Sequence, residues 1–216
     1  MIKIENLNVY GMKDAIRGMR NPMNSWDKSD SIFQELSQGY VYKIGENDRR
    51  LMYNLIKGGT EHRKFLRQIW VCMDITAPLY WWKEFDTYKV GTTANSCSTM
   101  HKIHDRPLTL EDFSFEHLYS DELEVLKIVI ATINGDRELY LDGRHKNDWW
   151  QMIQLLPSSY NQRRTVTMNY EVCMNICMQR EGHKLDEWHD FIATMKSGLP
   201  ELSNFVEVAK GEKEVD

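Results

Sequence analysis

The sequence lacks the features that mark several special classes of protein. Its 216 residues contain four cysteines and no C-x-x-C pair, which is too few for a disulfide scaffold. The longest apolar stretch, 125–133, contains Lys127 and is too short to span a bilayer. The N-terminus has no apolar region of the kind that a signal peptide needs. These absences predict a reduced, cytoplasmic protein with no membrane partner.

The sequence also lacks an excess of positive charge. It has 27 Lys and Arg against 32 Asp and Glu, so its formal net charge is −5. Binding to a nucleic-acid polymer or to an anionic membrane surface requires many unbalanced cations. We therefore expect neither partner, although the charge balance is compatible with a small basic pocket for one anionic ligand.

What the sequence does have is enough apolar and aromatic material for a well-packed core. Apolar residues make up 42% of the chain, which includes seven Trp and ten Tyr. The Trp81-Trp82 and Trp149-Trp150 pairs are expected in the core or in an interface, since aromatic side chains dominate buried contacts. With no repeat or low-complexity linker, the chain is predicted to form one domain over 1–209, followed by a charged tail over 210–216.

Hydrophobic periodicity predicts an α+β fold, in which helices pack on a small antiparallel or mixed sheet. The polar segment 22–46 is expected to be a long loop with one short helix. The segment 90–104, rich in small polar residues, is expected to be a loop that contacts ligand. Strands are predicted over 1–10, 65–75 and 163–167, and helices from Met12 to the Asn21-Pro22 stop and over 48–57, 79–88, 121–133, 147–156, 169–179 and 184–197.

Three segments carry motifs in the order found in one enzyme family. The first is a helix with a glycine cap, then His62, then a strand that leads into Ala77-Pro78 and an aromatic helix. The second is the loop after that helix. The third runs from Leu156-Pro157 through Thr167-x-Asn169, Asn175, Arg180 and His183 to Glu187. In these segments, about two thirds of the chain, the sequence resembles the flavin-dependent thymidylate synthases, also called thymidylate synthase complementing proteins.

The second segment departs from the family signature, Arg-His-Arg-x-x-Ser-x-Asn-Glu-x-Ser-x-Arg-Tyr. Thr87-Tyr88-Lys89 stands in place of Arg-His-Arg, so one cation of the three-residue motif remains. The final Arg-Tyr is missing, as is an arginine that the family carries just before its Leu-Pro. The other positions align after one inserted residue: Thr92 and Ser96 replace the first Ser and the Glu, and Asn95 and Ser98 match the Asn and the second Ser.

The resemblance implies the reductive methylation of dUMP to dTMP by a homotetramer. In the family, methylenetetrahydrofolate gives the carbon, FAD carries the hydride and NADPH reduces the flavin. By matching position, Arg180 is the residue that holds and polarises the uracil and is therefore the catalytic candidate. The other implied contacts are His62, Lys89, Asn169 and Asn175 for the flavin, and Asn95 and Ser98 for the nucleotide. Of Arg163 and Arg164, which point to opposite faces of one strand, at most one is expected to join this cluster.

Other interpretations of these residues stay open. The altered signature also fits a protein of this fold that has lost catalysis and binds a pyrimidine nucleotide or an assembly partner, or an enzyme acting on a modified pyrimidine nucleotide. Asn169 alone is typical of a helix N-cap, and Cys173 and Cys177 of small apolar core residues. Cys97, His101 and His104 have metal-ligand spacing, but no fourth ligand is adjacent and no metal is expected.

Overall fold

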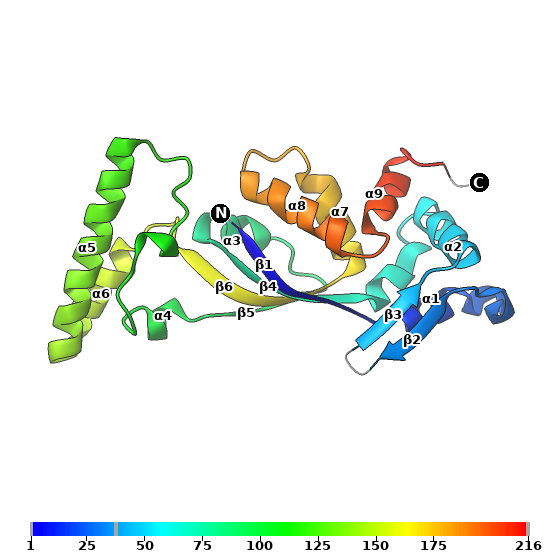
Figure 1. The fold of residues 1–216 in the computed structure, drawn as a ribbon, viewed down its shortest axis with the longest axis horizontal. Helices are drawn as coiled ribbons and strands as arrows, with labels where there is room; N and C mark the ends of the chain where they lie inside the picture. The colour runs from blue at the N-terminus through cyan, green and yellow to red at the C-terminus, as the bar shows by residue number, and fades with distance from the viewer. Residues whose placement is uncertain (1, 37–38, 215–216) are drawn as a thin grey trace. The chain divides into compact units, whose positions relative to one another are not determined.

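The computed structural model describes residues 2–36 and 39–214 (Figure 1). The strands are β1 (Lys3–Tyr10), β2 (Ile32–Leu36), β3 (Gly39–Lys43), β4 (Trp70–Pro78), β5 (Thr92–Ser96) and β6 (Asn161–Asn169). The α-helices are α1 (Met12–Met19), α2 (Glu46–Lys57), α3 (Leu79–Phe85), α4 (Thr99–Lys102), α5 (Ser120–Gly143), α6 (Lys146–Leu155), α7 (Tyr170–Arg180), α8 (Asp186–Gly198) and α9 (Leu202–Lys210). Short 3-10 helices are η1 (Asn21–Met23), η2 (Trp26–Lys28), η3 (Arg63–Gln68) and η4 (Leu110–Asp112).

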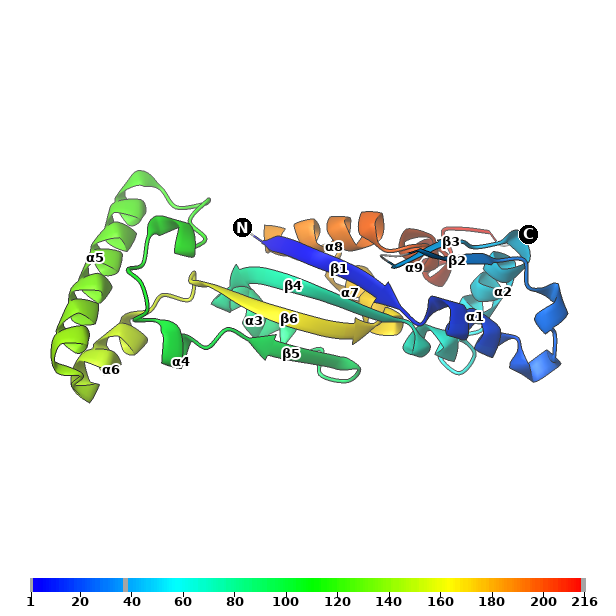
Figure 2. The same cartoon turned by 60° about the horizontal axis from the view of Figure 1, so that its bottom comes forward.

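The strands form two small sheets, which confirms the predicted α+β class. The larger sheet has the order β1-β4-β6-β5, and its neighbouring strands run in opposite directions (Figure 2). The smaller sheet is the β2–β3 hairpin, in which Phe33 pairs with Tyr42. Within the described residues, no helix is long and apolar enough to cross a membrane.

The chain packs as two compact units. The first contains residues 1–5, 74–87 and 94–166, and the second contains 6–73, 88–93 and 167–216. Each strand of the larger sheet therefore contributes residues to both units. The expectation of a single domain over 1–209 with a tail stays a prediction.

The core of the first unit lies between α5 and α6, which run side by side (Figure 1). The amide of Asn134 fixes the chain beside this core, because its Oδ1 accepts from the Leu108 N–H at 2.8 Å and its Nδ2 donates to the Leu108 carbonyl at 2.9 Å. Trp149 packs against the same cluster, while Trp81 and Trp82 are fully buried as expected. The buried members of the cluster are Ile103, Leu108, Phe113, Leu126, Ile130, Ile133 and Met152.

The core of the second unit is centred on Phe205 of α9. Its ring makes edge contacts with Tyr53, Phe65 and Tyr170, with centroids 6.2 to 6.3 Å apart. Such edge-to-face pairs stabilise beyond the area that they bury. The expectation that Cys173 and Cys177 act as apolar residues is confirmed, since both are fully buried and burial raises the pKa of the Cys177 thiol to about 12.

Two predictions from local pattern are wrong in the first half of the chain. The segment 22–46 contains a short helix as expected, η2, but it is not otherwise a long loop, because it forms the β2–β3 hairpin. Each strand of that hairpin has only five residues, and polar residues precede both strands. The alternating pattern that predicts a strand is therefore too short to recognise. The strand predicted over 65–75 begins only at Trp70, and residues 63–68 form η3, in which Phe65 and Leu66 are both buried.

Four further corrections concern the bounds and the number of elements. The helix predicted to end at Asn134-Gly135 continues to Gly143, because the residues that follow, among them Arg137, Glu138 and Leu139, are good helix formers. This helix begins at Ser120, one residue before the predicted start, and Tyr119 precedes it. The predicted loop 90–104 contains β5 and α4, and α9 follows the helix that the periodicity places last.

A buried ion pair joins α1 to α2 in the second unit. Arg20 Nε lies 2.6 Å from Asp48 Oδ1, and both side chains are almost fully buried. Asp48 Oδ2 accepts hydrogen bonds from the hydroxyls of Ser29 and Ser31 and from the backbone N–H of Asp30 and Ser31. Burial by itself would raise the pKa of Asp48, but the hydrogen bonds and the Arg20 charge together lower it.

The Asp48 carboxylate is predicted to hold this corner of the unit together. Replacing Asp48 by Asn leaves the Arg20 charge buried without its counter-charge, so Asp48→Asn should lower the free energy of unfolding by about 3 to 5 kcal/mol. Because the pKa is lowered in the folded state, this stabilisation is present above the unfolded pKa and disappears as pH falls through the folded pKa. Urea denaturation at neutral and acidic pH measures both effects. Asp27→Asn, an exposed carboxylate on η2, is the control, and equal losses in the two variants would contradict the prediction.

Candidate functional site

The turn between β6 and α7 brings three segments of the second unit together. Asn169 is the N-cap of α7, and its Oδ1 accepts the Val172 N–H at 3.0 Å. Its own N–H donates to the Gly91 carbonyl at 3.1 Å, and the next N–H, of Tyr170, donates to the Ile69 carbonyl at 2.9 Å. The turn therefore connects the loop before β5, the start of β4 and the start of α7 through backbone hydrogen bonds.

Gly91 is suited to this turn by its lack of a side chain. Its φ is +76°, and a Cβ at this position would lie 2.5 Å from Asn169 Nδ2. The next residue, Thr92, has a buried hydroxyl with no hydrogen-bond partner among the described residues. A buried hydroxyl without a partner carries a desolvation cost, and a polar ligand would satisfy it.

Arg180, at the other end of α7, is held by two aromatic residues. Its Nε donates to the Tyr88 hydroxyl at 2.9 Å, and that hydroxyl is 3.2 Å from Gln179 Oε1. Its guanidinium carbon lies 5.0 Å from the centre of the Trp188 ring and 5.5 Å from that of Tyr88. Stacking of this kind orients a guanidinium while keeping its positive charge.

Tyr88 and Trp188 are contacts of the candidate residue Arg180 that sequence reasoning missed. Tyr88 occupies the histidine position of the family signature, so it counted as a lost residue and not as a new partner for Arg180. The signal that could have found it is that tyrosine, like histidine, has a ring with a polar atom. Such a ring can take the place of a histidine beside an arginine. Trp188 follows Glu187, the last residue of the third motif, and only the tertiary packing shows that it reaches Arg180.

A second charged group lies at the start of α7. Glu171, which is 9% exposed, accepts from Arg63 Nε at 3.0 Å and has Arg67 Nε at 3.6 Å. One carboxylate thus partly neutralises two arginines of η3. The pair fixes η3 on α7, close in sequence to His62.

The remaining predicted site residues fall in different places. His62 and Lys89 are exposed in the second unit, and Asn175 is half-buried on α7, which also carries Arg180. Asn95 and Ser98 belong to the first unit, where Asn95 is exposed and Ser98 caps α4 by accepting the His101 N–H at 3.2 Å. Asn169, Asn175, Arg180, Lys89 and His62 therefore share one unit, and the ligand role of each stays a prediction.

Arg163 and Arg164 point to different surroundings, as the strand alternation predicts. Arg163 pairs with Asp74 at 2.7 Å and Glu5 at 3.7 Å. Arg164 pairs with Asp86 at 2.8 Å and stacks 4.2 Å above the Trp82 ring. Both guanidinium groups already have carboxylate partners in the first unit.

The segment with metal-ligand spacing does not form a ligand cluster. In the part of the chain that the structure describes, no three His, Cys, Asp or Glu side chains converge as metal ligands do. His104 instead packs edge-on against Tyr140, with ring centroids 5.0 Å apart. Cys97 is exposed and free.

Comparison with solved structures identifies the fold. The crystal structure of thymidylate synthase X (ThyX) from Helicobacter pylori with FAD and dUMP superposes with a TM-score of 0.68, covering 97% of this chain and 100% of that one at 17% identity. The chain has the thymidylate synthase X fold. A UMP/dUMP methylase, PolB from Streptomyces cacaoi, bound with 5-Br UMP, is similar at a TM-score of 0.66 and 13% identity, covering 98% of this chain and 94% of that one.

The sequence is far from those proteins even though the backbone is similar. No family model and no curated protein matches the chain. The thymidylate synthase X fold is therefore conserved here with largely different side chains. Function has to be argued from the site itself, because one fold can hold several activities.

The groups in the second unit fit a polar, anionic ligand. The unpartnered Thr92 hydroxyl, the half-buried Asn175 amide and the Arg180 guanidinium are the donor types that bind nucleobase carbonyls and phosphates. Lys89 adds an exposed ammonium one residue after Tyr88. This donor set suits a pyrimidine nucleotide and part of a flavin dinucleotide.

The Gly91 turn is predicted to be intolerant of a side chain. Gly91→Ala places a Cβ against Asn169 Nδ2 and forces a left-handed backbone on an L-residue, which should lower the free energy of unfolding by about 1 to 3 kcal/mol. Thermal denaturation checks the change. Gly135→Ala is the matched control, because Gly135 lies inside α5, where an added Cβ would meet nothing within 4 Å, and this variant should gain up to about 1 kcal/mol. Similar shifts in the two variants would contradict this account.

Proposed function

We propose that the protein is a divergent flavin-dependent thymidylate synthase. It methylates dUMP to dTMP, with methylenetetrahydrofolate as the carbon donor, FAD as the bound cofactor and NADPH as the reductant. The observation that carries the proposal is the held position of Arg180, in a chain whose backbone follows that of a protein crystallised with FAD and dUMP.

Arg180 is the proposed catalytic residue. A guanidinium beside a uracil carbonyl stabilises the negative charge that develops there when the ring is activated. Tyr88 and Trp188 keep this guanidinium oriented, so less side-chain freedom is lost when the nucleotide binds. Asn95 and Ser98 are proposed as nucleotide contacts from their match to the family signature.

The flavin contacts are proposed for His62, Lys89, Asn169 and Asn175. When bound, the flavin supplies the hydride, and the protein supplies orientation and charge. Lys89 contributes a point charge toward a phosphate, where the family uses arginines that bind two oxygens at once. Asn169 has the fewest side-chain atoms left to contact a flavin, because its Oδ1 already caps α7 and its Nδ2 faces Gly91.

A second candidate function follows from the altered signature. Tyr88 donates and accepts hydrogen bonds within the protein, so it does not replace the lost histidine and arginine as a ligand contact. This favours a protein that binds a pyrimidine nucleotide without methylating it, or that acts on a different pyrimidine nucleotide. The PolB neighbour, described as a UMP/dUMP methylase, has such a broader range of nucleotides.

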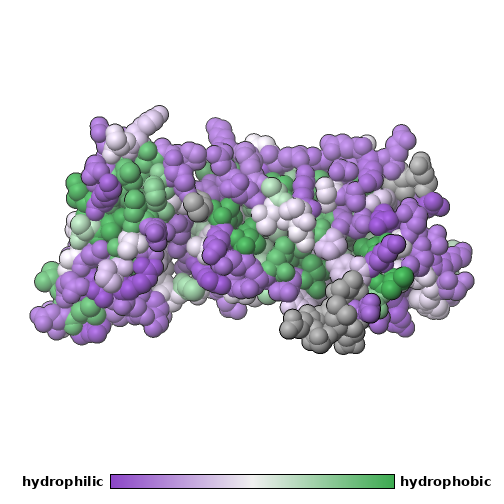
Figure 3. All heavy atoms as spheres, in the orientation of Figure 1, coloured by the Kyte–Doolittle hydropathy of each residue, from purple (hydrophilic) through white to green (hydrophobic). Residues whose placement is uncertain are grey.

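A homotetramer is proposed from the surface of α5. Val125, Ile128 and Leu139 are 60%, 64% and 60% exposed. Their spacing places them on one face of the helix, roughly opposite the buried Leu126 and Ile130. Figure 3 shows apolar side chains gathered over α5. Exposed apolar side chains that share one helix face, here called the α5 stripe, are typical of an interface.

Purified protein is expected to bind FAD and dUMP. The visible absorption spectrum detects bound flavin, and titration calorimetry measures dUMP affinity. Arg180→Gln should weaken dUMP binding about 10- to 100-fold, since hydrogen bonds to charged groups contribute about 1.5 to 3 kcal/mol. Arg50→Gln, an exposed residue on α2, should leave the affinity unchanged.

The outcomes separate the candidate functions. Protein without flavin absorption that takes up neither FAD nor dUMP contradicts both proposals. Nucleotide binding without formation of dTMP, when FAD, NADPH and methylenetetrahydrofolate are supplied, supports the second candidate. Turnover of dUMP supports the first.

The tetramer is tested by placing a charge in the α5 stripe. Ile128→Glu should convert the tetramer into smaller species, because a buried carboxylate without a partner destabilises an apolar interface. Sedimentation velocity measures the mass. Lys127→Glu changes the charge on the neighbouring exposed position, off the stripe, and should leave the mass unchanged. A monomeric wild-type protein would refute the tetramer.

A further inference from the structure

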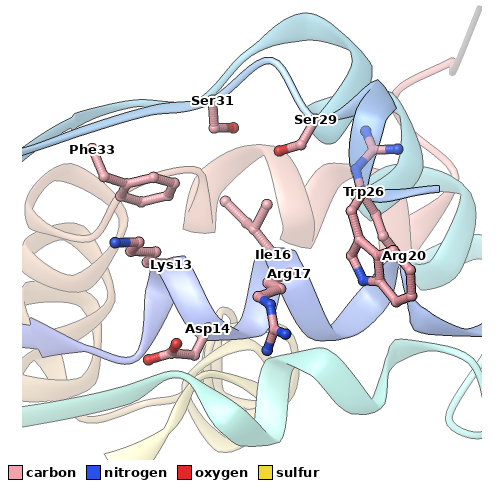
Figure 4. Close-up of a pocket in the computed structure, with 9 residues that line it drawn as sticks. All are labelled: Lys13, Asp14, Ile16, Arg17, Arg20, Trp26, Ser29, Ser31 and Phe33. Atoms are coloured by element: carbon pink, nitrogen blue, oxygen red, sulfur yellow. The ribbon is translucent and has the colours of Figure 1, made fainter. Parts of the chain in front are cut away.

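A cavity of about 260 Å³ lies in the second unit, between α1, η2 and β2 (Figure 4). None of its lining residues belongs to the proposed nucleotide and flavin site. Figure 4 shows the Phe33 ring and the Ile16 side chain pointing into the space between the strand and the helix. The cavity therefore has an apolar floor and wall.

Three cations line this cavity. Lys13 and Arg17 are one helical turn apart on α1, and Arg20 follows at the end of the same helix. Two carboxyl groups belong to the same region. Asp14 also lines the cavity, and Asp48 is bound to Arg20. The cations thus outnumber the carboxylates by one.

Arg20 has a donor that the protein leaves unused. The side chain is 4% exposed, with its Nε on Asp48 and its Nη1 on the Ser25 carbonyl at 3.2 Å. Its Nη2 is buried and has no hydrogen-bond partner among the described residues. An unsatisfied buried guanidinium N–H is costly, and an anionic oxygen is the acceptor that satisfies it best.

The hydroxyls on the opposite wall are already committed. Ser29 and Ser31 both donate to Asp48 Oδ2, at 2.8 and 2.6 Å. They fill the acceptor sites of the carboxylate and do not point a negative group into the cavity. The Asp48 charge is compensated by Arg20 and by these hydrogen bonds.

Two flat rings are fixed at the edge of the cavity. Trp26 is 46% exposed, yet its Nε1 donates to Asn21 Oδ1 at 2.9 Å, which holds the indole in place. Phe33 packs against Tyr42 with ring centroids 5.9 Å apart. Rings that are held before a ligand arrives lose little freedom on binding a flat molecule.

We propose that this cavity is a binding site for a small aromatic anion, a flat ring that carries a phosphate or a carboxylate. The ring packs against Trp26 and Phe33. The anionic group lies toward Arg17 and accepts the unused Arg20 Nη2–H, while Lys13 lies at the Phe33 end of the cavity. The site is distinct from the proposed dUMP site, and the inference does not depend on that function.

Titration calorimetry with four probes tests the chemistry. Phenyl phosphate and benzoate carry both a ring and an anion, cyclohexyl phosphate carries a saturated ring, and inorganic phosphate carries no ring. Phenyl phosphate or benzoate is expected to bind at least about fivefold more tightly than the two probes without an aromatic ring, given the usual strength of aromatic contacts. The tighter of the two aromatic probes identifies the anionic group. Absence of binding, or equal affinity for inorganic phosphate, overturns the proposal.

Variants locate the binding. Arg17→Gln and Trp26→Ala should each weaken the aromatic probe about fivefold, while Arg50→Gln, an equal change of charge outside the cavity, should not. Thermal denaturation verifies that each variant is folded. Equal losses of affinity in Arg17→Gln and Arg50→Gln would show that the probe responds only to the net charge of the protein. A loss in Arg180→Gln without one in Arg17→Gln would move the binding to the nucleotide site, and either result refutes the proposal.

Discussion

The hydrogen bonds at the β6–α7 turn are the constraint on which the proposed site depends. Asn169 caps α7 with its side chain and holds Gly91 with its backbone, and Tyr170 holds Ile69. A helix that starts at a fixed point and has a fixed length places its last residue as well. The cap at Asn169 therefore sets where Arg180 lies, 11 residues later at the end of α7.

The same turn explains why the signature could change without loss of the fold. The backbone of this loop depends on Gly91, which has a left-handed φ and leaves no room for a side chain. Residues 87–89 are exposed or half-buried, so their side chains are under little packing constraint. At position 88, where the resemblance aligns the histidine of the family signature, the tyrosine ring contacts Arg180 within the protein.

The elements that sequence could predict are those fixed by local chemistry. Asn169 is predictable as a cap because Asn favours that position, and α2, α6 and α7 follow their apolar spacing. The β2–β3 hairpin depends on Asp48, which is distant in sequence and binds Ser29 and Ser31 at the start of β2. The end of α5 could not be predicted from local pattern, because Asn134-Gly135 is a usual helix stop and the helix continues through it to Gly143. In the site, motif spacing is enough to select Arg180 and Asn175 as candidates. The rings that hold Arg180 come from two other segments, so the sequence does not indicate them.

The charged groups show how a chain of net −5 keeps its arginines in place. In the second unit Arg63 and Arg67 share Glu171, and in the first unit Arg163 and Arg164 pair with Asp74 and Asp86. The Arg180 guanidinium is held by the rings of Tyr88 and Trp188 as well, which fix its direction. For the proposed nucleotide site, the direction of this one guanidinium matters more than the number of cations, because a group that is already oriented loses less side-chain freedom on binding.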